Sequence, residues 1–245
     1  GDTVAWNLMR SIVKRDLRIP SNYLAALDVL DVENFIDYLL VNVYASTDDW
    51  PHNNWRAARE RVRGRDAKFR FYVWDAERAL GNLNRSPFNN TLTTELAIGS
   101  EIAQLYQSLG ESPEFRLHWA DRVQKHFYNG GALEDDKIEL SYRLMRGELA
   151  RVLPNMYTTI TSSWIPNRRP TIMQHMEQAD LHRSDAAPLF TPQHGGPVDD
   201  DFELTIRASG GLTIYYTLDG SDPRRALTRE NLSAVRTLVP ENAAK

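Results

Sequence analysis

Apolar and polar positions follow the period of a helix through most of residues 1–180. The clearest helix is predicted over residues 31–45, "DVENFIDYLLVNVYA", where Asp31 is a good N-cap and acidic residues occupy the first turn. Its apolar positions are almost continuous, which predicts a helix buried on most sides. Pro51 excludes a helical continuation into the next loop.

A period of two appears once in this region, in "KFRFYVW", residues 68–74. Phe69, Phe71 and Val73 fall on one face, and polar or amphipathic side chains fall on the other. A turn at Gly64 is expected before this segment. The pattern predicts a short buried strand that presents Asp75 at its carboxyl end.

Further helices are predicted after a polar loop over residues 82–94. They cover about 98–109, 113–128, 134–160 and 168–180. In the second of these, Ser112 is the expected cap, Pro113 takes the first helical position, and the apolar stripe is Phe115, Leu117 or Trp119, Val123 and Phe127.

The composition changes over residues 184–201, which are rich in Pro, Gly and Asp and indicate a domain boundary. Beyond it, "DFELTIRAS" and "LTIYYTLDG" alternate as strands, and "DGSDP" predicts a turn. The predicted fold class is therefore α+β. A mainly helical unit with a short β-hairpin covers 1–183, and a small all-β unit covers 184–245. The second unit is short for an independent sandwich, so we expect its last strands to be incomplete.

Composition and charge exclude several classes of function. The chain has 245 residues, 42% of them apolar, and a net charge of −4, which argues against broad binding to nucleic acid. No apolar run approaches the roughly 20 residues of a membrane span, and no signal peptide is evident. The absence of cysteine excludes disulfides and thiolate metal sites. The first residues already lie inside an amphipathic pattern, so we expect a piece of a longer protein.

The most unusual polar stretch is "STDDWPHNNW", residues 46–55. Asp49 is followed five residues later by Asn54, and Trp50, Pro51 and Trp55 would stiffen the loop between them. In phosphoryl transfer, this is the spacing of a base that accepts a hydroxyl proton and an amide that helps to hold Mg²⁺. The alternative is an Asx turn with helix caps, and the spacing alone favours it.

A second candidate acid is Asp75, which follows the predicted strand. A carboxylate at a strand end is costly to bury without a metal or a cation. Glu77 is placed to reach the same ion, and Gly81 permits a tight backbone afterwards. The alternative is that Asp75 caps a turn and pairs with Arg78 or Arg70.

Basic and polar side chains surround these acids in the sequence: His52, Asn53, Arg56, Arg59 and Lys68. Arginine and lysine in this setting suit phosphate. The alternative, which the composition favours, is a solvated face beside a hairpin. The other histidines, at 118, 126, 175, 182 and 194, lack metal-ligand spacing with acidic residues, so we assign no zinc site.

The order of these pieces resembles the spore-coat-protein-H (CotH) kinase family. The resemblance rests on "NFIDYLLVNVYASTDDWPHNNW", "KFRFYVWDAERALG" and "SPEFRLHWADRVQKHF", and it covers about residues 1–180. It implies an atypical kinase fold, here its C-terminal lobe, that uses ATP and Mg²⁺ to phosphorylate protein seryl groups outside the cytoplasm. A bacterial extracellular, spore-coat or cell-envelope location follows from the same resemblance.

The resemblance also implies residue roles. Asp49 would be the catalytic aspartate, Asn54 its metal-side amide, and Asp75 the aspartate that holds Mg²⁺. Glu77 stands where the family has a second aspartate, so a carboxylate is retained on a longer side chain. Apart from the resemblance, the polar set around these acids makes Asn53, Arg56 and Lys68 the candidates for nucleotide contact.

A kinase also needs a phosphate-covering loop and a strand lysine in an N-terminal lobe. Only 48 residues precede Asp49, they are predicted helical, and Lys14 is their single lysine. We therefore expect the N-terminal lobe to be absent from this chain.

The β unit resembles the C-terminal domain of chitobiase and β-hexosaminidase-type secreted proteins, through "APLFTPQHGG", "FELTIRAS" and "IYYTLDGSDPR". This implies an Ig-like accessory module of a secreted or envelope protein that docks on glycan or on another envelope protein. Tyr215 and Tyr216 are candidates for sugar contact, although alternating strand residues more often fill a core.

The leading hypothesis is an extracytoplasmic protein kinase acting on a secreted or envelope protein. One alternative is a non-catalytic envelope scaffold with a kinase-like lobe. A third is a glycosidase with Asp49 and an acid near Asp75 as paired carboxylates, which would lie about 5–10 Å apart.

Overall fold

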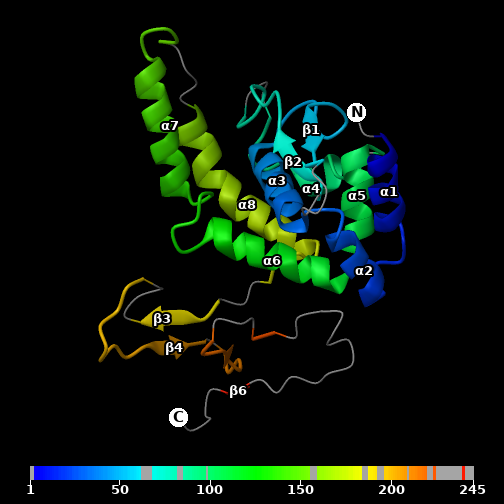
Figure 1. Ribbon diagram of the computed structural model, residues 1–245. Helices are drawn as coiled ribbons and strands as arrows, with labels where there is room; N and C mark the ends of the chain where they lie inside the picture. Colours follow the sequence, from blue (N-terminus) through cyan, green and yellow to red (C-terminus); the bar gives the residue numbers. More distant parts are fainter. Residues whose placement is uncertain are drawn as a thin grey trace. The chain divides into compact units, whose positions relative to one another are not determined.

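The computed structural model of the protein describes residues 3–61, 68–81, 85–97, 99–154, 159–183, 187–191, 196–208, 210–219, 223–224 and 239–240. They form two compact units, Gly1–His182 and Arg183–Lys245 (Figure 1). The described residues combine many helices with short antiparallel strands, so the predicted α+β class is confirmed. None of the described helices is long and apolar enough to cross a membrane.

Helix α3, Val32–Ala45, lies at the centre of the first unit (Figure 1). As predicted, Asp31 caps it, and the Asp31 carboxylate accepts a hydrogen bond of 3.0 Å from the Asn34 amide. Most of its side chains are buried, because α3 packs against helices α6 (Pro113–Phe127), α4 (Thr91–Thr94) and α8 (Ile165–Gln178) and against strand β2 (Arg70–Val73). The nearly continuous apolar run therefore reflects neighbours on several sides of one helix.

The bounds of the remaining described helices of this unit follow the predicted pattern in part. They are α1 (Thr3–Val13), α2 (Pro20–Leu27), α4 (Thr91–Thr94), α5 (Glu101–Gly110), α6 (Pro113–Phe127), α7 (Asp135–Leu149) and α8 (Ile165–Gln178).

Two predicted boundaries are wrong. The helix predicted over 134–160 ends at Leu149, and a short π-helical turn, Ile160–Trp164, leads into α8. The predicted polar loop contains α4, which is capped by Asn90. In α6, Trp119 is buried and Leu117 is 45% exposed, which decides between the two predicted positions.

A polar cluster ties α3 to α6. The Arg122 guanidinium donates to both carboxylate oxygens of Asp37, at 2.6 and 2.5 Å, and to Glu33 at 2.9 Å. His126 lies 2.8 Å from the same Asp37 carboxylate. Burial alone would raise the pKa of Asp37, but hydrogen bonds from His126 and Arg122 outweigh it and lower that pKa. The cluster fixes the relative position of the two helices.

The hairpin of the first unit pairs β1, Trp55–Ala58, with β2, Arg70–Val73, in antiparallel register. Strand β2 runs beside α3, since the Asp31 amide donates to the Phe69 carbonyl and the Asn34 side chain bonds the backbone of Phe71. Phe69 and Phe71 are buried as expected, but Val73 is 44% exposed. The predicted turn at Gly64 lies outside the described residues.

The described residues of the second unit form two short antiparallel ladders. Strand β3, Leu189–Thr191, pairs with β4, Thr205–Arg207, and β5, Tyr215–Tyr216, pairs with β6, Val239–Pro240. Within the described part of this unit these ladders do not make up the predicted Ig-like sandwich. Tyr215 is 49% exposed, so it does not fill a core.

A buried arginine on α8 joins three segments of the first unit. The Arg168 side chain is fully buried and donates to the carbonyls of Val43 and Tyr44 at the end of α3, at 2.5 and 2.8 Å. It also donates to the carbonyls of Pro87 and Asn89 and to the Thr91 hydroxyl, at 2.7–2.9 Å. Burial lowers the pKa of Arg168 to about 10, so the side chain is still charged at neutral pH. The negative end of the α3 dipole helps to stabilise that charge.

Replacement of Arg168 by Met is expected to lower the free energy of unfolding by about 3–5 kcal/mol, because it leaves buried carbonyl groups without their donor. Arg168→Lys should recover part of this loss, since an ammonium keeps the charge but lacks the planar fork. Urea unfolding measures both. Arg146→Met, on the exposed side of α7, is the control and should change stability by no more than about 0.5 kcal/mol. Equal losses in Arg168→Met and Arg146→Met would contradict the proposed role.

Candidate active site

The two acidic segments predicted from the sequence meet at the end of α3. After Ala45, Ser46 adopts a left-handed conformation that ends the helix. The Leu80 amide then donates to the Ala45 carbonyl at 2.8 Å, and the Asp48 amide donates to the Arg78 carbonyl at 2.8 Å. These bonds place the loop after α3 against the loop after β2.

Trp50 anchors the first of these loops. Its indole is fully buried and donates a hydrogen bond of 2.6 Å to the Tyr38 hydroxyl on α3. Trp55, five residues later, stacks on Trp6 of α1 with ring centroids 5.6 Å apart. The segment between them is therefore held at both ends, as the two tryptophans in the sequence suggested.

Adjacent aspartates in this loop have different environments. The Asp48 side chain is 18% exposed, bonds Arg78 at 2.7 Å, and makes a short bond to Arg85. The hydrogen bond from Arg85 holds the pKa of Asp48 below its ordinary value. The Asp49 side chain is 48% exposed, lies 3.4 Å from Arg78, and has His52 at 3.9 Å. Asp48 is thus a fixed anion of the scaffold, and Asp49 is the more accessible carboxylate.

Asn54 links the two loops directly. Its side-chain amide donates to the backbone carbonyl of Asp75 at 3.3 Å. Asp75 is exposed and, like Asp49, has a positive φ of 55°. The two arginines considered as partners of Asp75 pair elsewhere among the described residues: Arg70 bonds Asp31, and Arg78 bonds Asp48 and Asp49.

The structure brings two of the predicted metal ligands close together. Asp75 and Asn54 lie together, and Glu77 is exposed two residues further along. Among the described residues there is no group of three or more Asp, Glu, His or Cys side chains suited to a metal ion. Oxygen ligands from one or two carboxylates are nevertheless the set that Mg²⁺ uses when phosphate supplies the rest.

The predicted nucleotide contacts do not all lie at this site. The Arg56 guanidinium lies over the Trp74 ring, 4.4 Å from its centroid, and bonds the Trp55 carbonyl. Asn53 is exposed, and its amide donates to the Asp49 carbonyl at 3.1 Å. Lys68 precedes β2, whereas Asp75 follows it, so a strand separates the two. Arg59 likewise lies over Phe69, at the start of β2.

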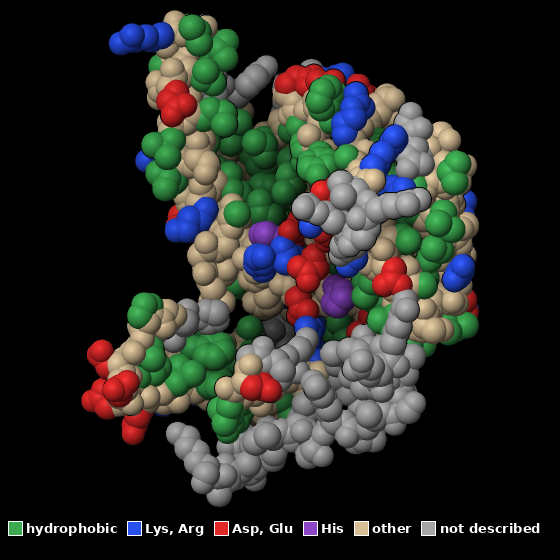
Figure 2. Space-filling model, viewed as in Figure 1, with side chains coloured by type: hydrophobic (Ala, Val, Ile, Leu, Met, Phe, Trp, Pro, Cys, Tyr) green, Lys and Arg blue, Asp and Glu red, His purple; other side chains and the backbone are tan. Residues whose placement is uncertain are grey.

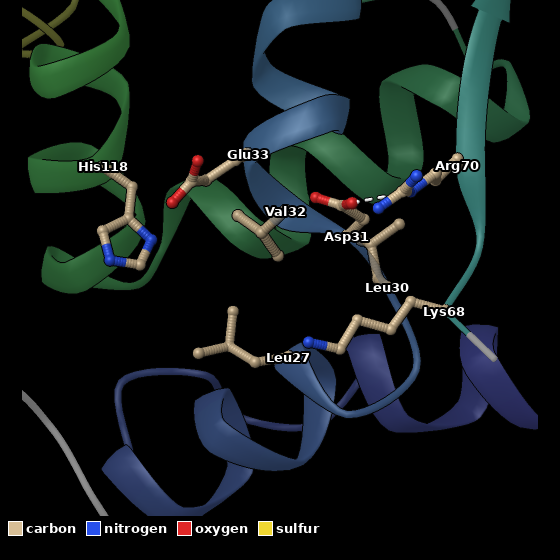
Figure 3. Close-up of a pocket in the computed structure, with 8 residues that line it drawn as sticks. All are labelled: Leu27, Leu30, Asp31, Val32, Glu33, Lys68, Arg70 and His118. Atoms are coloured by element: carbon tan, nitrogen blue, oxygen red, sulfur yellow. Dashed lines mark hydrogen bonds and ion pairs between the residues drawn. The ribbon is translucent and has the colours of Figure 1, made fainter. Parts of the chain in front are cut away.

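Lys68 instead lines a pocket at the beginning of α3 (Figure 3). The pocket has a volume of about 300 Å³ and is lined by Leu27, Leu30, Asp31, Val32, Glu33, Lys68, Arg70 and His118. Because α3 rises 1.5 Å per residue, its two ends lie about 20 Å apart. Lys68 and Asp49 therefore lie near opposite ends of this helix.

Several charged and polar groups of the pocket already have partners in the protein. Asp31 caps α3 and bonds Arg70 at 2.8 Å, and Glu33 bonds Arg122 at 2.9 Å. The His118 ring lies 3.0 Å from the Tyr23 hydroxyl. Figure 2 shows acidic and basic side chains interspersed on the visible face of the protein.

Three arginines outside the predicted site residues position the end of α3 and the loop after it: Arg78, Arg85 and Arg168. Arg85 bonds Asp48, Glu95 at 2.9 Å and the Ser46 hydroxyl at 3.4 Å, so it holds the start of the acidic loop. The sequence indicates a role for Arg78, because Arg78 follows Asp75 by three residues and is one of its two predicted alternative partners. The sequence around Arg85 and Arg168 contains no comparable indication of their partners.

The sequence of this chain matches one family model. A family model described as CotH kinase protein matches residues 7–175, a span that includes α3, both acidic loops and α6. The match covers more than half of the chain. The chain therefore belongs to the CotH kinase family. Searches of curated proteins and of solved structures find no match.

Asp48→Asn is expected to lower the free energy of unfolding at neutral pH by about 1–3 kcal/mol, because Arg78 and Arg85 lose an anionic partner. The folded-state pKa of Asp48 is lowered, so its contribution is complete above the unfolded pKa of about 3.9 and is lost as pH falls through the folded value. Urea unfolding between pH 2 and 7 should therefore show a shallower acid loss for Asp48→Asn than for the wild type.

Asp49→Asn is the matched control for this measurement. Its side chain is half exposed and its contact with Arg78 is long, so the expected change in stability is about 0.5 kcal/mol or less. A loss in Asp49→Asn as large as that in Asp48→Asn would contradict the different roles assigned to the two residues.

Proposed function

We propose that this chain is the C-terminal lobe of an extracytoplasmic protein kinase that transfers the γ-phosphate of ATP to hydroxyl groups of secreted or envelope proteins. Membership of the CotH kinase family supports kinase-related chemistry. The observation that carries the proposal is the junction at the end of α3, where Asn54 of the first acidic loop bonds Asp75 of the second. In this proposal the first loop supplies the base and an amide ligand, and the second loop supplies the carboxylates that a magnesium ion needs.

In this proposal Asp49 accepts the proton of the substrate hydroxyl. Its carboxylate is accessible, and the backbone around it is fixed by Trp50 and by the Asn53 amide. Asp48 keeps its two arginine partners and holds the loop. A positioned base of this kind contributes about 10²–10⁴-fold to a reaction rate.

Asp75, Asn54 and Glu77 would hold Mg²⁺ in this proposal, and the ion would neutralise phosphate charge when bound. The exposed Asp75 carboxylate and the Asn54 amide provide oxygen ligands of the kind Mg²⁺ prefers. Asn53 and Arg56 remain candidates for nucleotide contact. The position of Lys68 near the other end of α3 removes it from this set.

A non-catalytic envelope scaffold is the second candidate. Two observations favour it: Glu77 replaces an aspartate of the family pattern, and Lys68 lies in a pocket away from the acidic loops. In either case the second unit is proposed as an accessory module, Ig-like in the manner of its sequence resemblance, that contacts glycan or protein. Calorimetric titration of the full-length protein with Mg·ATP separates the two candidates, because a kinase must bind the nucleotide.

Asp49→Asn and Asp75→Asn are each expected to lower phosphate transfer by at least about 10²-fold, through loss of a base and of a metal ligand respectively. Transfer of labelled phosphate from ATP to an envelope-protein fraction measures this, and a chelator of Mg²⁺ should abolish it. Asp136→Asn, an exposed surface position on α7, is the control and should retain full activity. Wild-type activity in either site variant would contradict the assignment.

A further inference from the structure

The Arg78 side chain contacts both aspartates of the acidic loop. One terminal nitrogen lies 2.7 Å from Asp48, and the other lies 3.4 Å from Asp49. The side chain is 42% exposed, so it is neither buried nor fully solvated. We propose that Arg78 is the residue that binds the phosphoryl group during transfer. The inference rests on the proposed kinase function and deepens it, since it adds Arg78 to the phosphate-binding residues that the sequence predicts.

Asp48 anchors Arg78 independently of Asp49. The two residues make both a side-chain ion pair and a backbone hydrogen bond of 2.8 Å from the Asp48 amide to the Arg78 carbonyl. Arg85 is held on the other side of Asp48 and also bonds Glu95. Arg85 is thus committed to the scaffold, while Arg78 faces Asp49 with its second terminal nitrogen.

The contact between Arg78 and Asp49 is the weaker half of this arrangement. At 3.4 Å between half-exposed groups it contributes little, whereas the contact with Asp48 is shorter and better shielded. A guanidinium has five N–H donors in a planar fork that matches phosphate oxygens in a bidentate manner. A phosphoryl group at this position therefore competes well with Asp49 for Arg78, and the anchor on Asp48 stays in place.

The replacement of Asp49 by a phosphoryl group as a partner of Arg78 links nucleotide binding to the availability of the Asp49 carboxylate. When the fork of Arg78 turns to the phosphoryl oxygens, the Asp49 carboxylate is available to the substrate hydroxyl. The substrate oxygen then bonds to the γ-phosphorus, and the bond from that phosphorus to the bridging oxygen breaks. ADP leaves with the electron pair, and the hydroxyl proton passes to Asp49. Arg78 stabilises the charge that spreads over the transferred oxygens.

The other cations considered from the sequence are less suitable. Arg56 lies over Trp74 and bonds the backbone, and Lys68 lies near the opposite end of α3. Arg78 is thus the cation that the described residues bring to Asp49, apart from His52 when that ring is protonated.

The test compares the affinities of ATP, ADP and AMP for the full-length protein, measured by calorimetry with Mg²⁺ present. Arg78→Gln is expected to weaken ATP binding by about 10- to 100-fold, the effect of one charged hydrogen-bonding group, and to leave AMP binding unchanged. Arg78→Lys should recover part of the ATP affinity through its charge. Arg70→Gln is the control, because Arg70 also pairs with an aspartate, at the opposite end of β2, and should change neither affinity.

If the role of Arg78 is purely structural, Arg78→Gln weakens the binding of ATP, ADP and AMP to the same extent. That result would overturn the inference while leaving the kinase proposal intact. An unchanged ratio of ATP to AMP affinity in Arg78→Gln would overturn it as well. Absence of any nucleotide binding by the wild-type protein would overturn both proposals. Selective loss of ATP affinity, with partial recovery in Arg78→Lys, supports the inference.

Discussion

The charge of Arg168 at the end of α3 is the constraint on which the rest of the first unit depends. A fully buried guanidinium must find hydrogen-bond acceptors, and here they are backbone carbonyls and one hydroxyl, with no carboxylate among them. The last carbonyls of a helix lack partners within the helix and carry the negative end of its dipole. Arg168 satisfies this end of α3 and at the same time ties it to α8 and to the residues before α4.

This anchoring has a consequence for the site. The acidic loop begins immediately after the helix end that Arg168 holds, and Trp50 and Arg85 fix its next residues. Catalytic groups need support from residues that are themselves locked by packing and hydrogen bonds. The scaffold around Asp48 and Asp49 has this character, whereas Asp49 and Asp75 remain exposed. A rigid scaffold that carries accessible carboxylates suits the positioning of reactants and the neutralisation of phosphate charge. These are the main requirements of phosphoryl transfer.

Adjacent aspartates show how environment assigns roles to chemically identical residues. Asp48 meets two arginines, and hydrogen bonding from Arg85 lowers its pKa, so it stays ionised as part of the scaffold. Asp49 turns toward solvent with a positive φ, and its cationic contacts are longer. The sequence distinguishes the two only through the tryptophan that follows Asp49. Their environments differ because the arginines that meet Asp48 come from positions 78 and 85, far along the chain.

Much of the architecture could be predicted from the sequence, because it depends on neighbours along the chain. The buried character of α3, its cap at Asp31 and the β2 strand follow from local spacing, and the structure agrees with them. The family resemblance rests on quoted motifs, and the family match agrees with it. Tertiary structure alone decided which ion pairs form, that Lys68 lies near the far end of α3, and that Arg168 is buried. Long arginine and lysine side chains reach partners that are distant in sequence, and a period of apolar residues carries no record of those partners. In the described part of the second unit the short ladders do not make up the expected sandwich, since alternation predicts a strand but not the sheet against which it packs.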